Sequence, residues 1–148
     1  MPAIVEAHLV NDAVVTALRS ALEDHFGHAV PVGDAIAPSP DEGDPVLDLA
    51  AGYVRVYRVN ERPASAGFSG PSASMEVIRF QITGHGVQRN QADLFAGVAI
   101  SWLVDSANPI PIAGHDIIAR DKAGAVPADR EGGTIQIGGF VDLTVSLT

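Results

Sequence analysis

Two segments in which apolar and polar side chains alternate constrain the fold of this 148-residue chain more than any other feature. In residues 75–83, Ile78, Phe80 and Ile82 would lie on one face of a strand, and residues 140–147 show the same period of two. Such strands are typical of antiparallel sheets that have one covered and one solvated face. The rest of the chain must therefore supply elements that cover the apolar face.

Two other segments show helical spacing, with apolar side chains three or four positions apart. The first helix is expected to begin near Asn11 or Asp12, which are both good N-caps, and to end at Gly27. The second is expected over residues 90–105, because the Asn108-Pro109 pair that follows is incompatible with a continuing helix.

Four shorter segments are also predicted as strands, at residues 29–32, 53–59, 116–120 and 134–137. Most of them are enriched in β-branched or aromatic residues, which pack well on a pleated surface. The tripeptide Gly84-His85-Gly86 is expected to form a turn after the strand at residues 75–83.

Three long stretches are predicted to be loops. Residues 33–52 contain three prolines, which forbid regular ladder pairing over much of the stretch. Residues 60–74 are rich in Ala, Gly, Ser and Pro, and residues 121–133 are charged and glycine-rich. Loops of such length within a domain are usually functional or disordered.

The order of these elements predicts an α+β fold in a single domain over residues 1–148. We expect a mixed, mainly antiparallel sheet of about five strands, with two helices packed on one face. Hydrophobic residues make up 47% of the sequence, which suffices for a core without disulfides or metals.

Composition removes several classes of function. The absence of cysteine excludes disulfides, thiolate nucleophiles and cysteine-based metal sites. Acidic side chains outnumber basic ones by 18 to 9, and a surface with a net charge of −9 repels nucleic acid. The first residues lack a basic segment and a long apolar segment, so a secretory signal is not expected, and no apolar run is long enough for a membrane helix.

Motifs that carry chemistry are weak or missing. The glycines at 133 and 138 have P-loop spacing, but Gly139-Phe140 stands where Lys and Ser or Thr are needed. There is no Gly-x-Ser-x-Gly elbow, no His-Glu-x-x-His and no EF-hand pattern. We therefore expect no catalytic, cofactor-binding or metal-binding residues, and no enzymatic activity. Three aromatic side chains at core spacing are expected to fill the core rather than to line a ligand pocket: Phe80, Phe95 and Trp102.

The order of parts over nearly the whole chain resembles the tail terminator proteins of long-tailed, siphovirus-type bacteriophages. The resemblance rests on the helix motif at residues 14–19 with Leu22, the strand at 53–57, residues 80–86, Gln91-Ala92-Asp93, and Gly132-Gly133 followed by residues 140–146. None of these motifs is chemical, and other phage neck and tail-completion proteins share parts of the pattern.

The resemblance implies a structural virion protein at the head–tail junction, assembled in the host cytoplasm. Such proteins form a homo-oligomeric ring, usually a hexamer, that caps the head-proximal end of the tail tube and stops its polymerisation. The partners would be the tail tube protein and the head–tail connector protein. DNA would pass through the ring without specific binding, and neither a cofactor nor a membrane would be involved.

A ring needs sheet edges or long loops for its lateral contacts, and the loops at residues 60–74 and 121–133 are available for them. Seven side chains in or beside the two later loops are predicted to contact a neighbouring subunit or the tube: Glu61, Arg62, Phe68, Arg120, Lys122, Arg130 and Glu131. Four acids in the first loop are predicted to contribute to an acidic lumen: Asp41, Glu42, Asp44 and Asp48.

Two alternatives remain open at the level of sequence. One is another head–tail connector or neck protein, such as a head-closure or tail-completion protein. The other is a small ligand-binding domain with His85 or His115 in a pocket. Only its contacts would distinguish another neck protein, whereas replacing both histidines and testing assembly would distinguish the ligand-binding domain.

Overall fold

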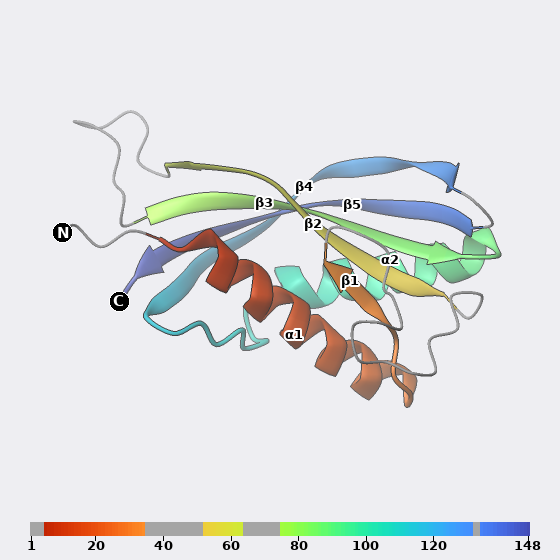
Figure 1. Ribbon diagram of the computed structural model, residues 1–148, viewed down its shortest axis with the longest axis horizontal. Helices are drawn as coiled ribbons and strands as arrows, with labels where there is room; N and C mark the ends of the chain where they lie inside the picture. Colours follow the sequence, from red (N-terminus) through yellow and green to blue (C-terminus); the bar gives the residue numbers. More distant parts are fainter. Residues whose placement is uncertain (1–4, 35–51, 64–74, 132–133) are drawn as a thin grey trace.

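The computed structural model describes residues 5–34, 52–63, 75–131 and 134–148. Within these ranges the chain forms two helices and five strands (Figure 1). The helices are α1 (Ala7–Phe26) and α2 (Arg89–Val104). The strands are β1 (Val32–Asp34), β2 (Tyr53–Pro63), β3 (Met75–Gly86), β4 (His115–Glu131) and β5 (Thr134–Leu147).

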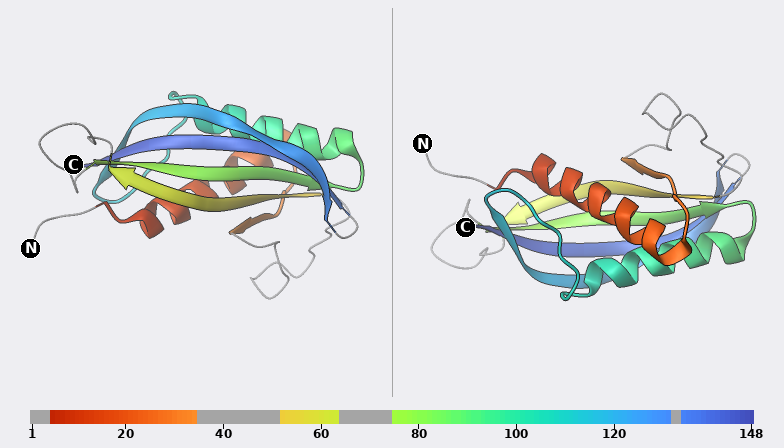
Figure 2. Two further views of the ribbon diagram at one scale, coloured as in Figure 1. Left: turned by 90° about the horizontal axis from the view of Figure 1, so that it is seen from above. Right: turned by 90° about the horizontal axis from the view of Figure 1, so that it is seen from below.

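The strands form one sheet in the order β1-β2-β3-β5-β4. The short β1 runs parallel to β2, and every other neighbouring pair is antiparallel. Figure 2 shows both helices on the same face of the sheet, with the opposite face turned away from them. The α+β fold, the mixed and mainly antiparallel sheet and the two covering helices are therefore confirmed.

The core lies between the sheet and the helices. Ile78, Phe80 and Ile82 of β3 are fully buried, as the alternation of this segment predicts. β5 contributes Val141, Leu143 and Val145 to the same layer. The helices add their apolar stripes, chiefly Val10, Val14, Leu18 and Leu22 from α1 and Phe95, Ala99 and Leu103 from α2. Full burial of each large apolar side chain contributes roughly 1.5–3 kcal/mol to the free energy of unfolding.

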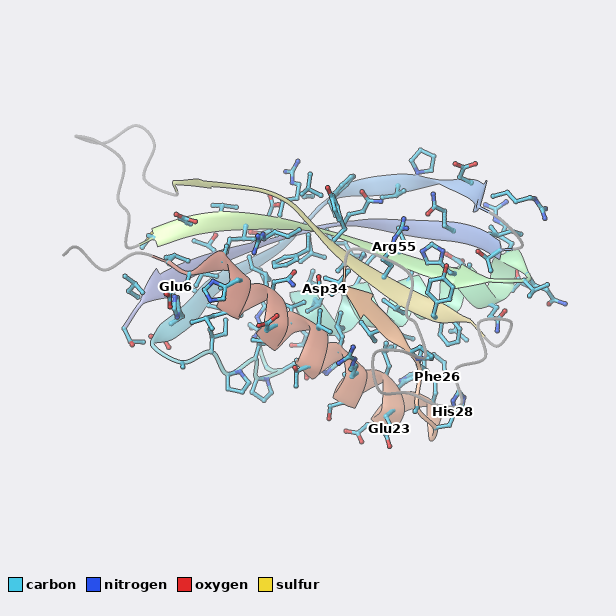
Figure 3. The ribbon with its side chains drawn as sticks, in the orientation of Figure 1. Glu6, Glu23, Phe26, His28, Asp34 and Arg55 are labelled. Atoms are coloured by element: carbon cyan, nitrogen blue, oxygen red, sulfur yellow. The ribbon has the colours of Figure 1, made fainter. Side chains whose placement is uncertain are left out.

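The first helix begins earlier than the sequence suggests. Asn11 is not an N-cap but a buried residue of the second turn, where its Nδ2 donates to Asp34 Oδ2 at 2.8 Å. This bond links α1 to the end of β1 (Figure 3). The predicted end of α1 at Gly27 is confirmed, with a left-handed φ of 76° and its N–H donating to the carbonyl of Glu23.

Glycine pairs were misleading as turn signals. Gly84-His85-Gly86 is the end of β3 rather than a turn. Residues 134–137 and 140–147, expected as two strands, belong to the single strand β5, which includes Gly138 and Gly139. A Cβ atom at Gly138 would meet the backbone of Ile82 and Thr83 on β3. Glycine is needed there because two backbones approach closely, which is the other common reason for a glycine within a strand.

The segment at residues 121–133, predicted as a loop, is mostly strand. β4 is 17 residues long and continues to Glu131, so the predicted strand at 116–120 is only its first part. Three register shifts, between Ile117 and Ala119, Lys122 and Gly124, and Val126 and Asp129, interrupt its pairing with β5. These irregularities allow charged residues, a glycine and a proline within the strand.

Three other expectations need adjustment or fall outside the described residues. The strand expected at residues 29–32 is β1, at Val32–Asp34. The strand expected at residues 53–59 extends to Pro63, so residues 60–63 of the expected loop are strand. Residues 35–51 and 64–74, which hold the rest of two expected loops, lie outside the described residues. Among the described residues there is no helix of sufficient length and apolar character to cross a bilayer.

Candidate interaction surfaces

The longest uncovered element of the sheet is the edge strand β4. It is the last strand in the order, so one side of its backbone faces no other strand among the described residues. Most of its side chains beyond Arg120 are exposed, and Ile118 leaves 54% of its surface exposed. Strands usually run to about 3–10 residues, and a long open edge is a template for pairing with another chain.

The edge of β4 also carries features that oppose indiscriminate pairing. Its three register shifts bend the strand, and Pro127 lacks a backbone N–H. Charged residues occur along its length, including Asp121, Lys122 and Arg130, which are all exposed. Native proteins use such features to prevent edge-to-edge aggregation. A partner at β4 would therefore be selected by side chains as much as by backbone pairing.

The structure brings four of the seven predicted contact residues onto β4. Lys122 and Arg130 are exposed, and Glu131 ends the strand. Arg120 instead points toward α2, where its guanidinium donates to the carbonyl oxygens of Asp105 at 2.7 Å and Asn108 at 2.6 Å. Arg120 therefore ties β4 to the end of α2 within the chain.

Of the other predicted contact and lumen residues, two lie on β2 and the rest are outside the described residues. Glu61 and Arg62 lie on β2, paired in register with Ile78 and Val77 of β3. Phe68 lies outside the described residues, as do all four lumen candidates: Asp41, Glu42, Asp44 and Asp48.

The sheet face that is turned away from the helices carries a forked ion pair. Arg79 donates from Nε to Asp142 Oδ1 at 2.9 Å and from Nη2 to Oδ2 at 3.1 Å, between adjacent strands β3 and β5. The Arg79 guanidinium also lies 5.8 Å from the ring centroid of Phe140. Asp142 raises the pKa of Arg79, mainly through these hydrogen bonds. This face is therefore polar but ordered by its own side chains.

His85 is fully buried at the end of the same face. Its ring stacks on Tyr53 of β2 with centroids 4.4 Å apart, and its Nε2 lies 2.9 Å from Thr83 Oγ1. Within the described part of the chain, Nδ1 has no hydrogen-bond partner. Burial, and secondarily the charge of Arg55, lowers the pKa of His85 to about 4. His85 is thus a neutral, buried residue outside the apolar core, not an exposed base.

His115 connects the start of β4 to the start of α1. Its Nε2 accepts a hydrogen bond from the backbone N–H of Glu6 at 3.1 Å (Figure 3), and its Nδ1 lies 2.6 Å from the carbonyl oxygen of Ala113. These two contacts fit the neutral tautomer that carries its proton on Nδ1. Both ring nitrogens are used within the chain, which indicates a structural role.

A groove between the two helices is a concave surface that the sequence did not reveal. Two cavities of about 610 and 620 Å³ share Ala21, Trp102 and Asn108 in their walls. Phe80 and Phe95 are buried in the core as predicted, but Trp102 is only partly buried because it forms part of this groove. In the sequence, Trp102 has the spacing of a core residue. That spacing does not reveal that the side chains facing it on α1 are small and leave it accessible.

The described residues offer little for metal chemistry. Among them, no three His, Cys, Asp or Glu side chains come together in a way that could hold a metal ion.

A scan against protein-family models finds no match for this chain, and a search of curated proteins finds no relative.

Proposed function

We propose that this chain is a structural protein of a phage tail, which forms a ring at the head-proximal end of the tail tube. In this role the ring, a homo-oligomer and most simply a hexamer, stops polymerisation of the tube and presents the surface that joins the head connector. The proposal extends the sequence resemblance to the tail terminator proteins. It places the working protein in the virion, at the head–tail junction.

The observation that supports the proposal most is the 17-residue edge strand β4. A ring of identical subunits needs two different, complementary surfaces on each subunit, so that each copy contacts the next head to tail. A long edge with exposed Ile118, Lys122 and Arg130 is suited to be one of them. Its bulges and charges would limit pairing to a partner of matching shape, as a closed ring requires.

The acidic balance of the chain is compatible with a ring that DNA crosses. A net charge of −9 per subunit gives a surface that repels phosphates, so DNA would pass without adhering. His115 lines a cavity of about 480 Å³, as the ligand-binding alternative requires of one histidine. Both of its ring nitrogens are nevertheless used within the chain, and His85 is buried under Tyr53, so neither ring is available to a ligand. Another neck protein, such as a head-closure or tail-completion protein, is the nearest alternative. It would differ from a tail terminator in the proteins that it contacts.

Cryo-electron microscopy tests the proposal directly. The purified protein would be mixed with tail tubes of the particle that contains it, and the tube ends would be imaged. We expect a sixfold ring at one end only, and tubes that no longer elongate. Tubes that lack any additional density at both ends would contradict the proposal.

A variant of β4 tests the role of the edge. We expect Ile118→Asp to reduce the fraction of capped tubes at least tenfold, because it places a charge in an apolar contact. Burying that charge would cost roughly 1–3 kcal/mol of binding free energy. Val87→Asp is the matched control, since Val87 is 52% exposed but lies between β3 and α2 rather than on the edge. Equal capping by both variants would show that β4 is not the lateral contact.

A further inference from the structure

The groove between α1 and α2 has features of a docking site. In Figure 2 (right), both helices and the connection from α2 to β4 lie in front of the sheet, on the face that the helices cover. One cavity is lined by residues of α1, Trp102 and the prolines at 109 and 111 of that connection. The other is lined by the end of α1 and by one side of α2, including Leu94, Gly97 and Val98.

The lining of the groove is mainly apolar. Ala13, Ala17 and Ala21 lie at helical spacing on α1, so that side of the helix has small side chains. Trp102 lies between the two cavities, and Leu94 is 54% exposed. Leu94 and the partly buried Trp102 thus leave apolar surface accessible within a concave site, where a ligand could cover it.

The rim of the groove is acidic. Asp12 and Asp24 line one cavity and Asp93 lines the other, and all three are exposed. Asp105 also lines the second cavity, but the Arg120 guanidinium donates to its carbonyl oxygen and offsets part of its charge. Among the described residues that line the two cavities there is neither a lysine nor an arginine. An apolar lining between carboxylates complements a ligand that has an apolar stripe flanked by positive charges.

We propose that this groove binds an amphipathic helix of another protein, with an apolar face flanked by lysines or arginines. Helix-in-groove binding uses apolar anchors three and four positions apart, which would lie over Trp102. The groove follows α1 from Asp12 to Asp24, a rise of about 18 Å, which corresponds to about three turns of a bound helix.

A second copy of this chain is a poorer occupant. Each of its helices carries a single arginine, Arg19 in α1 and Arg89 in α2, and no lysine. Two copies with a net charge of −9 each would also repel one another across an acidic rim. The inference concerns a different surface from β4 and does not depend on the proposed ring.

Trp102 makes the test direct, because it is the only tryptophan in the chain. The probe is a synthetic peptide of about 14 residues with leucines at positions i, i+3, i+4, i+7 and i+11 and lysines between them. A second peptide has glutamates in place of the lysines. We expect the lysine peptide to shift the Trp102 emission saturably, and the glutamate peptide to bind at least roughly tenfold more weakly.

Variants then locate the binding. Ala21→Leu narrows both cavities, and we expect it to weaken binding of the lysine peptide by roughly tenfold or more. Asp24→Asn with Asp93→Asn is expected to weaken it roughly three- to tenfold, the size of two lost surface ion pairs. The matched control is Asp116→Asn with Asp121→Asn on β4, which removes the same charge away from the groove and should leave binding unchanged.

Three results would overturn the proposal. The first is failure of the lysine peptide to bind, or equal binding of both peptides. The second is an equal effect of the groove and control neutralisations, which would reveal only a general attraction to an acidic protein. The third is a Trp102 shift that depends on protein concentration without any peptide and is lost in Ala21→Leu, which would make a second copy the occupant. Circular dichroism of each variant confirms that its helices are intact.

Discussion

At the scale of single residues, the buried imidazole of His85 ties stability to pH. The pKa of this group is about 4 in the folded chain, mainly through burial, against an ordinary value of 6.5 when the chain is unfolded. Protonation would place a charge between Tyr53 and Thr83, where Nδ1 has no acceptor among the described residues. The unfolded chain therefore binds a proton at a higher pH than the folded chain does.

We expect His85 to contribute stability that is complete above pH 6.5 and is lost as the pH falls toward 4. The difference between the two pKa values corresponds to roughly 3–4 kcal/mol at most in the free energy of unfolding. Urea denaturation at several pH values between 7.5 and 4 measures this loss. His85→Gln cannot titrate, so its free energy of unfolding should fall less over the same interval.

The comparison between the two proteins isolates the imidazole. Carboxylates also titrate toward pH 4, but they do so equally in the wild type and in His85→Gln. Parallel stability curves for the two proteins would mean that His85 is accessible to water or protonated in the folded state.

At the scale of elements, the packing of α2 on β3 depends on one glycine. A Cβ atom at Gly84 would meet the carbonyl oxygen of Ala92 and lie 2.6 Å from the backbone nitrogen of Ala96. Because both atoms belong to the helix backbone, no side chain can move aside. We expect Gly84→Ala to lower the free energy of unfolding by about 1–3 kcal/mol in urea denaturation.

A glycine on the exposed side of α2 provides the control. A Cβ atom at Gly97 would meet no atom within 4 Å, and the residue lies inside the helix. Gly97→Ala should raise the free energy of unfolding by about 0.5–1 kcal/mol, since alanine restricts the unfolded chain. A loss of stability in both variants, or in neither, would contradict the close contact at Gly84.

The elements that sequence reasoning located best are those with a clear period. The buried faces of β3 and β5 and the end of α1 at Gly27 follow from local patterns, and the structure agrees. β4 was missed beyond Arg120 because its charges, glycine and proline are loop signals when read locally. Their presence in a strand depends on pairing with β5 and on three register shifts, which are tertiary features.

The candidate surfaces were predictable only in part. Lys122 and Arg130 were identified from the sequence as contact residues, but they were assigned to a loop. The hydrogen bond from Arg120 to the carbonyl oxygen of Asp105 was not predicted. The groove was missed because its walls come from α1, α2 and the segment after α2, which no local pattern relates to one another. Trp102 has the spacing of a core residue, and only the small side chains opposite it leave it partly exposed.

At the scale of the whole molecule, one excess of negative charge acts on two proposed surfaces in opposite ways. Copies that carry a charge of −9 repel one another, so the lateral contact of a ring must overcome that repulsion. The acidic rim of the helix groove, in contrast, would attract a basic helix. The two surfaces should therefore respond to salt with opposite signs.

We expect the ring to form more readily as the salt concentration rises from about 0.01 to 0.15 M, because the Debye length falls from about 30 to 8 Å. Over the same range the lysine peptide should bind the groove more weakly, since its attraction is screened. Sedimentation velocity at fixed protein concentration measures the first effect, and Trp102 emission the second. A ring that dissociates as salt is added would require contacts of opposite charge between subunits, for which exposed Lys122 and Arg130 on β4 would be the first residues to neutralise.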